Sequence, residues 1–432
     1  MAIIMKEAQP VERRLEDQRK ITDTVARMIE TVRDGRDAAV REYSKNLDGW
    51  SPASFRLNAD EVRAAIRAVP ATVLEDISFC QAQVRTFAEA QKRSLGEFEI
   101  ETMPGVRLGQ KNIPIANVGS YVPGGRYPMV ASAHMSIIPA KVAGVGRIAA
   151  CTPPLRGEIP AATVAAMHLA GANEIYVLGG VQAVAALALG TETIPKVDFF
   201  AGPGNAYVAE AKRQLFGEVG IDLLAGPTEI LVVADETADP SIVAADLLSQ
   251  AEHGPTSPAI LISLSAMLAD AVLAEIPHQL ESLPTADIAR LAWETHGKVL
   301  LVASLDEAVA EADAIASEHV EILTRDPRYF LEHMRNYGAL FLGEGTTVAY
   351  GDKAIGTNHI LPTNNAATYT GGLWVGKYLK TLTYQECDPA GSLAVGKVAA
   401  RQCRIENFEG HARACDLRVA KYGQAAAARQ FV

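Results

Sequence analysis

Apolar residues recur three and four positions apart through most of the first hundred residues. This spacing places them on one face of an α-helix and therefore predicts helices. The segments with this pattern are residues 21–47, 59–69 and 72–94. The start of the chain is thus predicted to be helical.

From about residue 106 the pattern changes to short apolar runs that alternate with Ala-rich helical segments. The runs cover residues 113–122, 147–154, 174–180 and 197–202, and the helical segments cover residues 131–145, 161–171, 182–190 and 206–217. Strands separated by helices of this length predict crossover units and a parallel sheet.

The alternation resumes at residue 229 with new material. Further apolar runs, again separated by helical segments, cover residues 229–235, 259–265, 298–304, 320–324 and 339–344. Two helix starts are well marked, because Asp239 precedes Pro240 and Ser304 stands three residues before Glu307. The pattern therefore predicts a second α/β layer with its own sheet.

Beyond about residue 345 the regular pattern stops. Residues 345–372 are rich in Gly, Asn and Thr, which predicts a long loop of the kind that usually has a function. The last fifty-odd residues are helical and polar in pattern. We expect this tail to pack on a partner subunit and not to form a core of its own.

Length, composition and charge indicate a globular protein with more than one domain. The 432 residues exceed the size at which a single core keeps growing, so two or three domains are expected. The net charge of −11 opposes a broad phosphate-binding surface and argues against nucleic acid as a partner. Charged residues begin at Lys6, so residues 1–20 have no long apolar core and fit neither a signal peptide nor a transmembrane helix. We therefore expect a cytoplasmic protein without a membrane partner.

Three Gly-rich turns, residues 122–128, 178–183 and 201–207, follow predicted strands and open predicted helices. Backbone N–H groups at such turns can face an anion or a dinucleotide, although each turn alone is also typical of an ordinary loop. Residues 144–150 loosely match the usual nicotinamide motif but lead from a helix into a strand, which is the wrong direction. Together the three turns suggest a ligand crevice at the carboxyl ends of the strands.

Gln250 and His253 stand three positions apart at the end of a predicted helix, so both side chains can reach one ion. The same pair also fits the polar tip of a surface helix. Asp352 and His411 bring the candidate set to four N and O donors, but spacing cannot establish ligands that are so dispersed. The five cysteines include no Cys-x-x-Cys pair, which argues against a thiolate zinc site or a disulfide framework.

Glu318 and His319 stand side by side where a predicted helix ends and a strand begins. We interpret this position as the sheet edge on which α/β sites form. A carboxylate and an imidazole can share proton transfers near neutral pH, and a solvated polar turn is the alternative. Other polar candidates are His359 in the loop, Glu406 in the tail, and His134, which follows a Gly-rich turn.

Seven stretches, in this order, resemble the histidinol dehydrogenase family from roughly residue 20 to the C-terminus. They are "YVPGG", "AGPGNAYVAEAK", "AGPTEILVVAD", "DLLSQAEHG", "SEHVEIL", "GTNHILPT" and "GHARA". The resemblance implies two incomplete Rossmann-like α/β/α domains and a homodimer that exchanges helical tails. The implied division is a helical tail at 1–23, a discontinuous catalytic α/β domain at 24–121 and 230–373, an NAD-binding α/β domain at 122–229, and a helical tail at 374–432.

In that family a small primary alcohol is oxidised to a carboxylate in two NAD-dependent steps with zinc. By resemblance, His319 takes the alcohol proton and Glu318 activates the water that attacks the aldehyde. The implied zinc ligands, which also contact the substrate, are Gln250, His253, Asp352 and, from the other subunit, His411. The implied NAD contacts are Tyr121, Gln182 and Asn205, and further substrate contacts are Thr228, His359 and Glu406.

Some residues depart from the histidinol-oxidising pattern. Members of that kind follow "LPT" with Gly-Gly and an Arg, whereas this chain has Asn364 and Asn365, and Arg126 and His134 also differ. "YTGGLWVGKYLKT" resembles the sulfopropanediol dehydrogenase branch. The expected substrate is therefore 2,3-dihydroxypropane-1-sulfonate, oxidised to sulfolactate, with these four residues as N–H donors to the sulfonate. L-histidinol is the alternative.

Two functions of other classes are also compatible with the sequence at this point. A zinc hydrolase can use the same Glu318, His319 and metal for water attack, but it does not need the Gly-rich turns. A non-catalytic nucleotide-binding protein explains the fold, but it does not explain why the acid–imidazole pair and all four candidate ligands are present.

Overall fold

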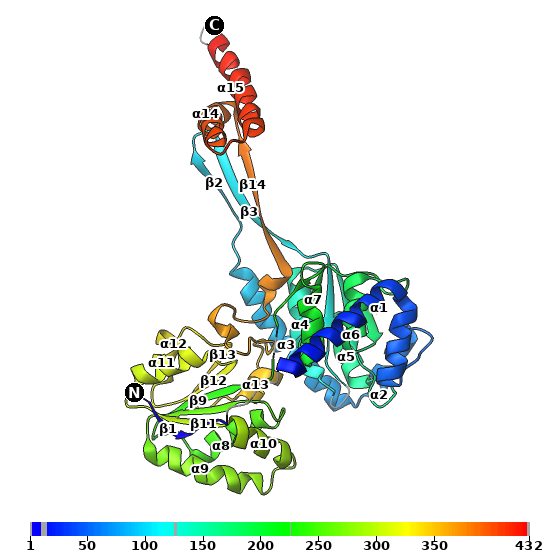
Figure 1. The fold of residues 1–432 in the computed structure, drawn as a ribbon, viewed down its shortest axis with the longest axis vertical. Helices are drawn as coiled ribbons and strands as arrows, with labels where there is room; N and C mark the ends of the chain where they lie inside the picture. Colours follow the sequence, from blue (N-terminus) through cyan, green and yellow to red (C-terminus); the bar gives the residue numbers. More distant parts are fainter. Residues whose placement is uncertain (1, 10–14, 125–127, 225, 430–432) are drawn as a thin grey trace. The chain divides into compact units, whose positions relative to one another are not determined.

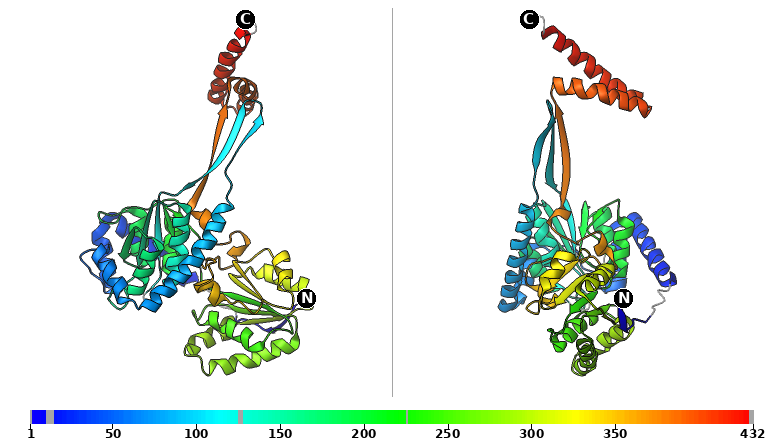
Figure 2. Two further views of the ribbon diagram at one scale, coloured as in Figure 1. Left: turned by 180° about the vertical axis from the view of Figure 1, so that it is seen from behind. Right: turned by 90° about the vertical axis from the view of Figure 1, so that its left-hand side faces the viewer.

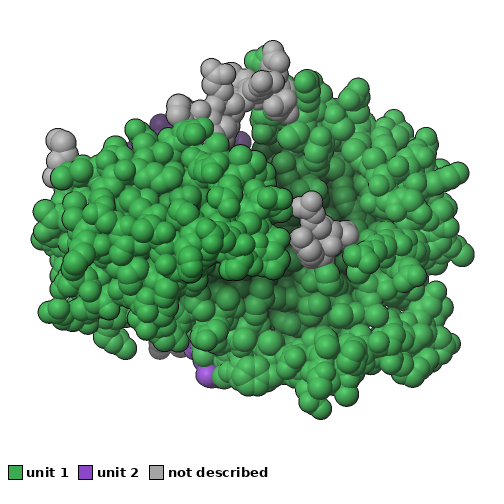
Figure 3. Space-filling view, turned by 90° about the horizontal axis from the view of Figure 1, so that it is seen from below, with its two compact units in different colours: residues 1–92, 115–378 green, residues 93–114, 379–432 purple. Residues whose placement is uncertain are grey.

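The computed structural model describes residues 2–9, 15–124, 128–224 and 226–429. The chain divides into two compact units (Figures 1 and 2). The first unit contains residues 1–92 and 115–378, and the second contains residues 93–114 and 379–432. Figure 3 shows the first unit as the green body, which is hollowed on the face in view.

Three helices occupy most of the first hundred residues, as predicted. They are α1 (Leu15–Asp48), α2 (Ala59–Ala68) and α3 (Ala71–Arg93). Asn58 begins α2 with a capping box, because its side chain accepts from the Glu61 N–H while the Glu61 side chain accepts from the Asn58 N–H.

A five-stranded parallel sheet forms the first α/β layer. Its strands are β4 (Asn117–Tyr121), β5 (Arg147–Thr152), β6 (Glu174–Val177), β7 (Phe199–Ala201) and β8 (Gly220–Ile221), in the order β6-β5-β4-β7-β8. The connecting helices are α4 (Val130–Ala143), α5 (Ala161–Ala170), α6 (Gly180–Leu189) and α7 (Ala206–Leu215). The chain winds outward from β4 in both directions, so the strand order reverses between β4 and β7.

A six-stranded sheet forms the second layer. Its strands are β1 (Ile3–Lys6), β9 (Ile230–Ala234), β10 (Ala259–Ser263), β11 (Lys298–Leu301), β12 (His319–Leu323) and β13 (Ala339–Leu342), in the order β1-β11-β10-β9-β12-β13. The connecting helices are α8 (Pro240–Ala251), α9 (Ala266–Leu280), α10 (Ala286–His296), α11 (Leu305–Ile315) and α12 (Pro327–His333). Its five parallel strands repeat the winding of the first sheet, and β1 adds an antiparallel edge. The two incomplete Rossmann-like domains are thus confirmed.

The segment predicted as a long loop contains two short helices, and a third follows directly after it. These are α13 (Val348–Lys353), η1 (Ala366–Thr368) and η2 (Val375–Tyr378). Asp352 therefore lies on a helix and not in a loop.

The second unit is a three-stranded antiparallel sheet followed by two helices. Its elements are β2 (Phe98–Met103), β3 (Val106–Pro114), β14 (Leu379–Cys387), α14 (Pro389–Ile405) and α15 (Glu409–Arg429). The C-terminal segment was expected to be helical throughout, so β14 is a difference from that expectation.

The structure also groups the N-terminal segments differently from the expected division. Val25 and Val32 of α1 share one hydrophobic core with Leu187 and Phe200 of the five-stranded layer, although residues 24–121 were assigned to the other domain. Residues 3–6 form strand β1, so the expected helical tail at 1–23 begins with a strand. None of the described helices is both long and apolar enough to cross a membrane.

Candidate functional site

The acid–imidazole pair lies at the amino end of β12. Helix α11 ends at Ala316 in a left-handed conformation, and the chain then turns so that Glu318 immediately precedes the strand that His319 begins. Thr228 and Glu229 lie beside them, because β9 pairs with β12 in parallel from Ile230 onward. The pair therefore lies on the amino edge of the second sheet. The prediction that it lies on the usual ligand-binding edge was wrong, since α/β sites form at the carboxyl ends of strands.

Hydrogen bonds fix the Glu318 carboxylate. Its Oε2 accepts from the Thr228 hydroxyl at 2.6 Å and from the Glu229 N–H at 3.2 Å. The Thr228 hydroxyl also lies 3.2 Å from Oε1 of Gln250, at the end of α8. Thr228 thus connects the carboxylate to the first candidate zinc ligand.

The surroundings of His319 determine which ring nitrogen is available. Nδ1 lies 3.1 Å from the Glu229 carbonyl oxygen, which can only accept, so Nδ1 carries a proton. Nε2 is buried without a hydrogen-bond partner and lies 3.5 Å from Oδ1 of Asp352. In the neutral ring, Nε2 is therefore the nitrogen that can accept a proton.

Burial and neighbouring charges shift the pKa values of these groups. Burial raises the pKa of Glu318 to about 7, against the opposing effects of His319 and Thr228. For His319, burial favours the neutral ring, but the charges of Glu318 and Asp352 outweigh it and raise the pKa to about 9. A cation held at Asp352 would weaken that attraction and favour the neutral ring.

The candidate zinc ligands Gln250, His253 and Asp352 come from two helices, α8 and α13. Gln250 is buried, and His253 lies just beyond the end of α8. Desolvation of its ring lowers the pKa of His253, and the nearby charge of Asp352 opposes that shift. Asp352 also faces His319, whose proximity holds the pKa of this carboxyl well below its usual value against the effect of burial.

These side chains fit part of a zinc site. In the described ranges, no three His, Cys, Asp or Glu side chains are arranged to hold a metal ion. Gln250 adds an amide oxygen to the imidazole of His253 and the carboxylate of Asp352, which makes three N and O donors in one neighbourhood. Zinc usually takes four ligands, so one more donor is needed.

The expected NAD contacts lie at the carboxyl edge of the first sheet, where the strand order reverses. Tyr121 ends β4 and its hydroxyl accepts from the Gly180 N–H at 3.1 Å, whereas Asn205 caps α7 after β7. Gln182 in the first turn of α6 is 1% exposed, and its Oε1 has no hydrogen-bond partner. A Cβ at Gly180 would lie 2.7 Å from that oxygen. A buried acceptor beside a glycine at this edge fits a dinucleotide crevice.

The four residues expected to contact a sulfonate differ in whether they can donate a hydrogen bond or carry a positive charge. Arg126 lies outside the described residues. His134 is buried, and its Nδ1 accepts from the Gln81 amide at 3.1 Å; burial lowers its pKa to about 4, so it is a neutral N–H donor and not a cation.

The two asparagines, Asn364 and Asn365, already make hydrogen bonds within the protein. Asn365 donates its side-chain amide to the carbonyls of Ala314 and Ile315, at 3.1 and 3.3 Å, and so caps the end of α11. The Asn364 N–H donates to the Glu229 carboxylate at 3.0 Å. Asn365 therefore supports the local backbone, and its amide is not free for a ligand.

His359 lies at the boundary between the two α/β layers. Its Nδ1 is 3.0 Å from the Asp352 carbonyl oxygen, and its Nε2 is 3.2 Å from the hydroxyl of Ser132 on α4. This ring thus joins the segment that carries Asp352 to a helix of the first layer.

Glu406 and His411 belong to the second unit. Glu406 ends α14 and His411 lies in the first turn of α15, with its ring 5.4 Å from that of Phe408. Both residues are exposed. Both flank the turn between these helices, and the described residues of the second unit give neither of them a metal or substrate partner.

Two residues with clear roles were missed by sequence reasoning. The backbone of Glu229 holds both members of the pair, with its N–H on Glu318 and its carbonyl on His319. Asp48, at the end of α1, accepts from the Gln182 amide at 2.9 Å. The position of Glu229 beside Thr228 was an available signal, whereas nothing in the sequence connects Asp48 with Gln182.

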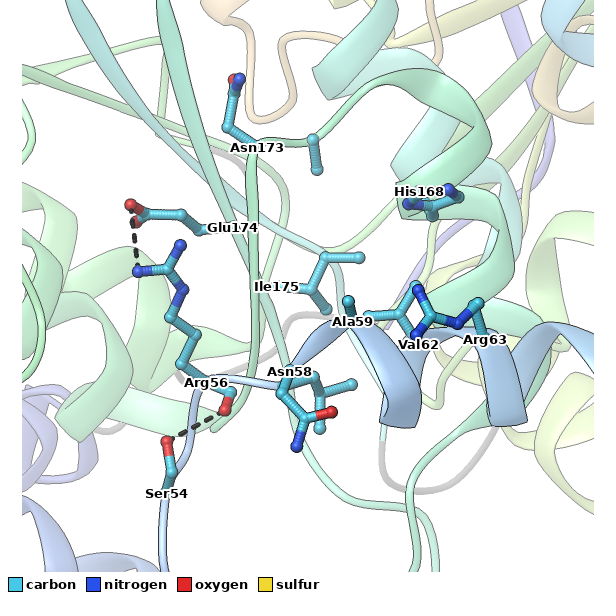
Figure 4. A pocket seen from close by; sticks show the side chains of 12 residues that line it. Ser54, Arg56, Asn58, Ala59, Val62, Arg63, His168, Asn173, Glu174 and Ile175 are labelled. Atoms are coloured by element: carbon cyan, nitrogen blue, oxygen red, sulfur yellow. Dashed lines mark hydrogen bonds and ion pairs between the residues drawn. The ribbon is translucent and has the colours of Figure 1, made fainter.

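A separate pocket of about 710 Å³ lies beside β6 (Figure 4). Arg56 and Glu174 line it and form an ion pair at 3.6 Å, and Arg63 pairs with Asp60. Because its arginines already have acidic partners, we assign it no ligand.

Fold and site together are those expected of an α/β oxidoreductase, with the expected NAD contacts in one layer and an acid–imidazole pair on the sheet of the other. The family model of histidinol dehydrogenase matches residues 11–419. A histidinol dehydrogenase homologue from Shouchella clausii is 61% identical over 405 residues, which cover 94% of this chain and 96% of the relative. Sulfopropanediol 3-dehydrogenase from Ruegeria pomeroyi is 46% identical over 409 residues, 94% of each chain. The crystal structure of histidinol dehydrogenase from Elizabethkingia anophelis matches with a TM-score of 0.89 and 32% identity, over 97% and 99% of the two chains.

The chain belongs to the histidinol dehydrogenase family. It is an NAD-dependent oxidoreductase that acts on alcohols, and the family reaction is a four-electron oxidation of an alcohol to an acid. This membership excludes the zinc hydrolase and the non-catalytic nucleotide-binding protein.

Proposed function

We propose that this enzyme oxidises 2,3-dihydroxypropane-1-sulfonate to sulfolactate with zinc and two NAD. The observation that supports the chemistry best is the buried Glu318–His319 pair, in which Nε2 of His319 has no partner and faces Asp352. The full-length similarity to a relative named sulfopropanediol 3-dehydrogenase supports the substrate.

The two oxidations use the same pair in different ways. In the first, His319 accepts the hydroxyl proton of the alcohol through Nε2 as hydride passes from the carbon to NAD. In the second, Glu318 accepts a proton from the water that adds to the aldehyde, and His319 accepts the hydroxyl proton of the resulting hydrate as a second hydride leaves. A carboxyl with a pKa near 7 is well suited to this exchange of protons.

Zinc would be held by Gln250, His253 and Asp352 together with His411 of a second copy of this chain. Bound there, it would polarise the substrate hydroxyl and hold it in place. The donor set supports this proposal, because one chain contributes three N and O donors and the usual number is four.

A homodimer that exchanges its tails would supply the missing donor. His411 and Glu406 are exposed on the second unit, whose sheet also leaves apolar side chains uncovered, among them Phe98, Ile100 and Leu382. Apolar surface of this kind usually marks an interface.

The substrate is tested by measuring kcat/KM for the sulfonate and for L-histidinol with the same zinc and NAD concentrations. We expect two NADH per molecule of 2,3-dihydroxypropane-1-sulfonate and little turnover of L-histidinol. Histidinol needs acceptors for its ammonium group, whereas a sulfonate needs N–H donors such as Nε2 of His134. A clear preference for L-histidinol would overturn the substrate and leave the reaction class standing.

The Glu318→Gln variant separates the two oxidations. It should slow the oxidation of supplied aldehyde by about a hundredfold, because the amide cannot accept the water proton. The first oxidation should change much less, because Nε2 of His319 remains. Stopped-flow NADH formation with alcohol and with aldehyde checks this division. Thr228→Val, which keeps the Glu318 carboxylate but removes the hydroxyl that donates to Glu318 and Gln250, provides a comparison. Equal rates of aldehyde oxidation in Glu318→Gln and wild type would contradict the assignment.

A further inference from the structure

Two acidic side chains lie close together behind the site, and the proposed mechanism does not use them. Glu321 on β12 is 0% exposed, and Asp246 lies on α8. Oε1 of Glu321 accepts from the Val348 N–H at 2.7 Å, and Oδ1 of Asp246 accepts from the Thr347 hydroxyl at 3.0 Å. The pair therefore joins α8 and β12 to the start of α13.

The other oxygen of each carboxyl, Oδ2 of Asp246 and Oε2 of Glu321, is buried and has no hydrogen-bond partner among the described residues. The two side chains lie within hydrogen-bonding reach of each other. Two buried carboxylates that interact in this way repel unless they share a proton. Burial, and then the charge of Asp246, raise the pKa of Glu321, and burial also raises the pKa of Asp246, so the pair favours holding one proton between its two carboxyls.

Helices α8 and α13 each carry a site residue four positions from the pair or its contact, and strand β12 carries one two positions away. Gln250 follows Asp246 by four residues on α8, and Asp352 follows Val348 by four residues on α13. His319 precedes Glu321 by two residues on β12. Side chains four apart on a helix, or two apart on a strand, share one face. The pair therefore lies on the same faces as the base and two candidate zinc ligands.

We propose that Asp246 and Glu321, through one shared hydrogen bond, are positioning residues that hold Gln250, His319 and Asp352 in register. This inference rests on the proposed roles of those three residues. Groups that orient metal ligands typically change metal affinity or activity by about 10- to 100-fold when they are replaced.

The test compares Glu321→Gln with Glu321→Met in the full-length enzyme. Gln can donate to Asp246 through its amide and accept from the Val348 N–H, so it keeps both hydrogen bonds, whereas Met keeps neither. Zinc affinity is measured by competition with a chromogenic chelator, and kcat by NADH formation. We expect zinc affinity and kcat close to wild type for Glu321→Gln, and zinc affinity about 10- to 100-fold weaker for Glu321→Met.

Asp235→Leu is the matched control. Asp235 is 9% exposed and accepts from two backbone N–H groups, Thr237 and Arg325, at the opposite edge of the same sheet. It should lower the unfolding temperature without weakening zinc binding. If Glu321→Met does not fold, Thr347→Val keeps both carboxyls but removes the hydroxyl that donates to Asp246, and it should still weaken zinc binding.

Either of two results would overturn the inference. One is wild-type zinc affinity in Glu321→Met or, where that variant does not fold, in Thr347→Val. The other is equal damage in Glu321→Gln and Glu321→Met, since the amide keeps the hydrogen bonds. Failure of the proposed function itself is seen separately, as absence of zinc binding in the wild-type chain.

Discussion

The His319→Asn variant is expected to lose about ten-thousand-fold in kcat for both oxidations, the upper end of the range for a lost general base. The imidazole is placed for this role by one contact, because Nδ1 faces the carbonyl of Glu229 and leaves Nε2 as the accepting nitrogen. The Asn amide can still donate to that carbonyl, so the local structure should be kept. Each oxidation removes a hydroxyl proton, so alcohol and aldehyde substrates should be affected alike.

Binding measurements separate a chemical defect from a structural one. NAD affinity, followed by the quenching of protein fluorescence, should be unchanged in His319→Asn, because the proposed NAD contacts Tyr121, Gln182 and Asn205 belong to the other α/β layer. His333→Asn is a suitable control, since this histidine is exposed at the end of α12. Turnover of the alcohol within tenfold of wild type would show that another group is the base.

Loss of zinc and of activity is the expected result of His411→Ala. One chain contributes only three candidate donors, and removal of the fourth leaves a site below the usual coordination number. Metal analysis after gel filtration should show little zinc in the variant, while its circular dichroism spectrum stays that of the wild type. Full zinc occupancy in His411→Ala would remove this residue from the ligand set.

Mixed dimers test whether His411 acts across subunits. A His411→Ala chain paired with a His253→Ala chain should regain about half of the wild-type activity, because one of the two shared sites is then intact. Each variant alone should be inactive. If His411 served the site of its own chain, the mixed dimer would contain no intact site and no activity would return.

The alternation of apolar runs and helices predicted both parallel sheets because each strand there is buried on two faces. Ile230–Ala234 and His319–Leu323 are buried at every position, and such continuous runs are easy to identify. Strand β1 was missed because its partner β11 lies almost three hundred residues away along the chain. Strand β14 was missed because nearly all its side chains are exposed. Without a buried face, its sequence shows no clear alternation of apolar and polar residues.

The sequence predicted the parts of the candidate site that depend on side-chain type. It did not predict the parts that depend on the course of the backbone. Glu318 and His319 are adjacent, and their pairing follows from proximity alone. The edge on which they lie depends on the winding of the sheet, and sequence reasoning placed them on the wrong one. The contacts of Glu229 come from its N–H and carbonyl, which every non-proline residue has, so no residue type could have indicated them.

Strand β1 also has a consequence for synthesis on the ribosome. Its residues Ile3 and Ile4 are made early, but their pairing partners Leu301 and Leu300 are translated almost three hundred residues later. At the usual rate of about 5–20 residues per second, this interval is roughly 15 to 60 seconds. The five-stranded sheet, which is contiguous in the chain, has its last strand at Gly220–Ile221 and can be completed within that time. Strand β1 therefore stays unpaired while the first layer folds, a period in which a chaperone has access to its apolar side chains.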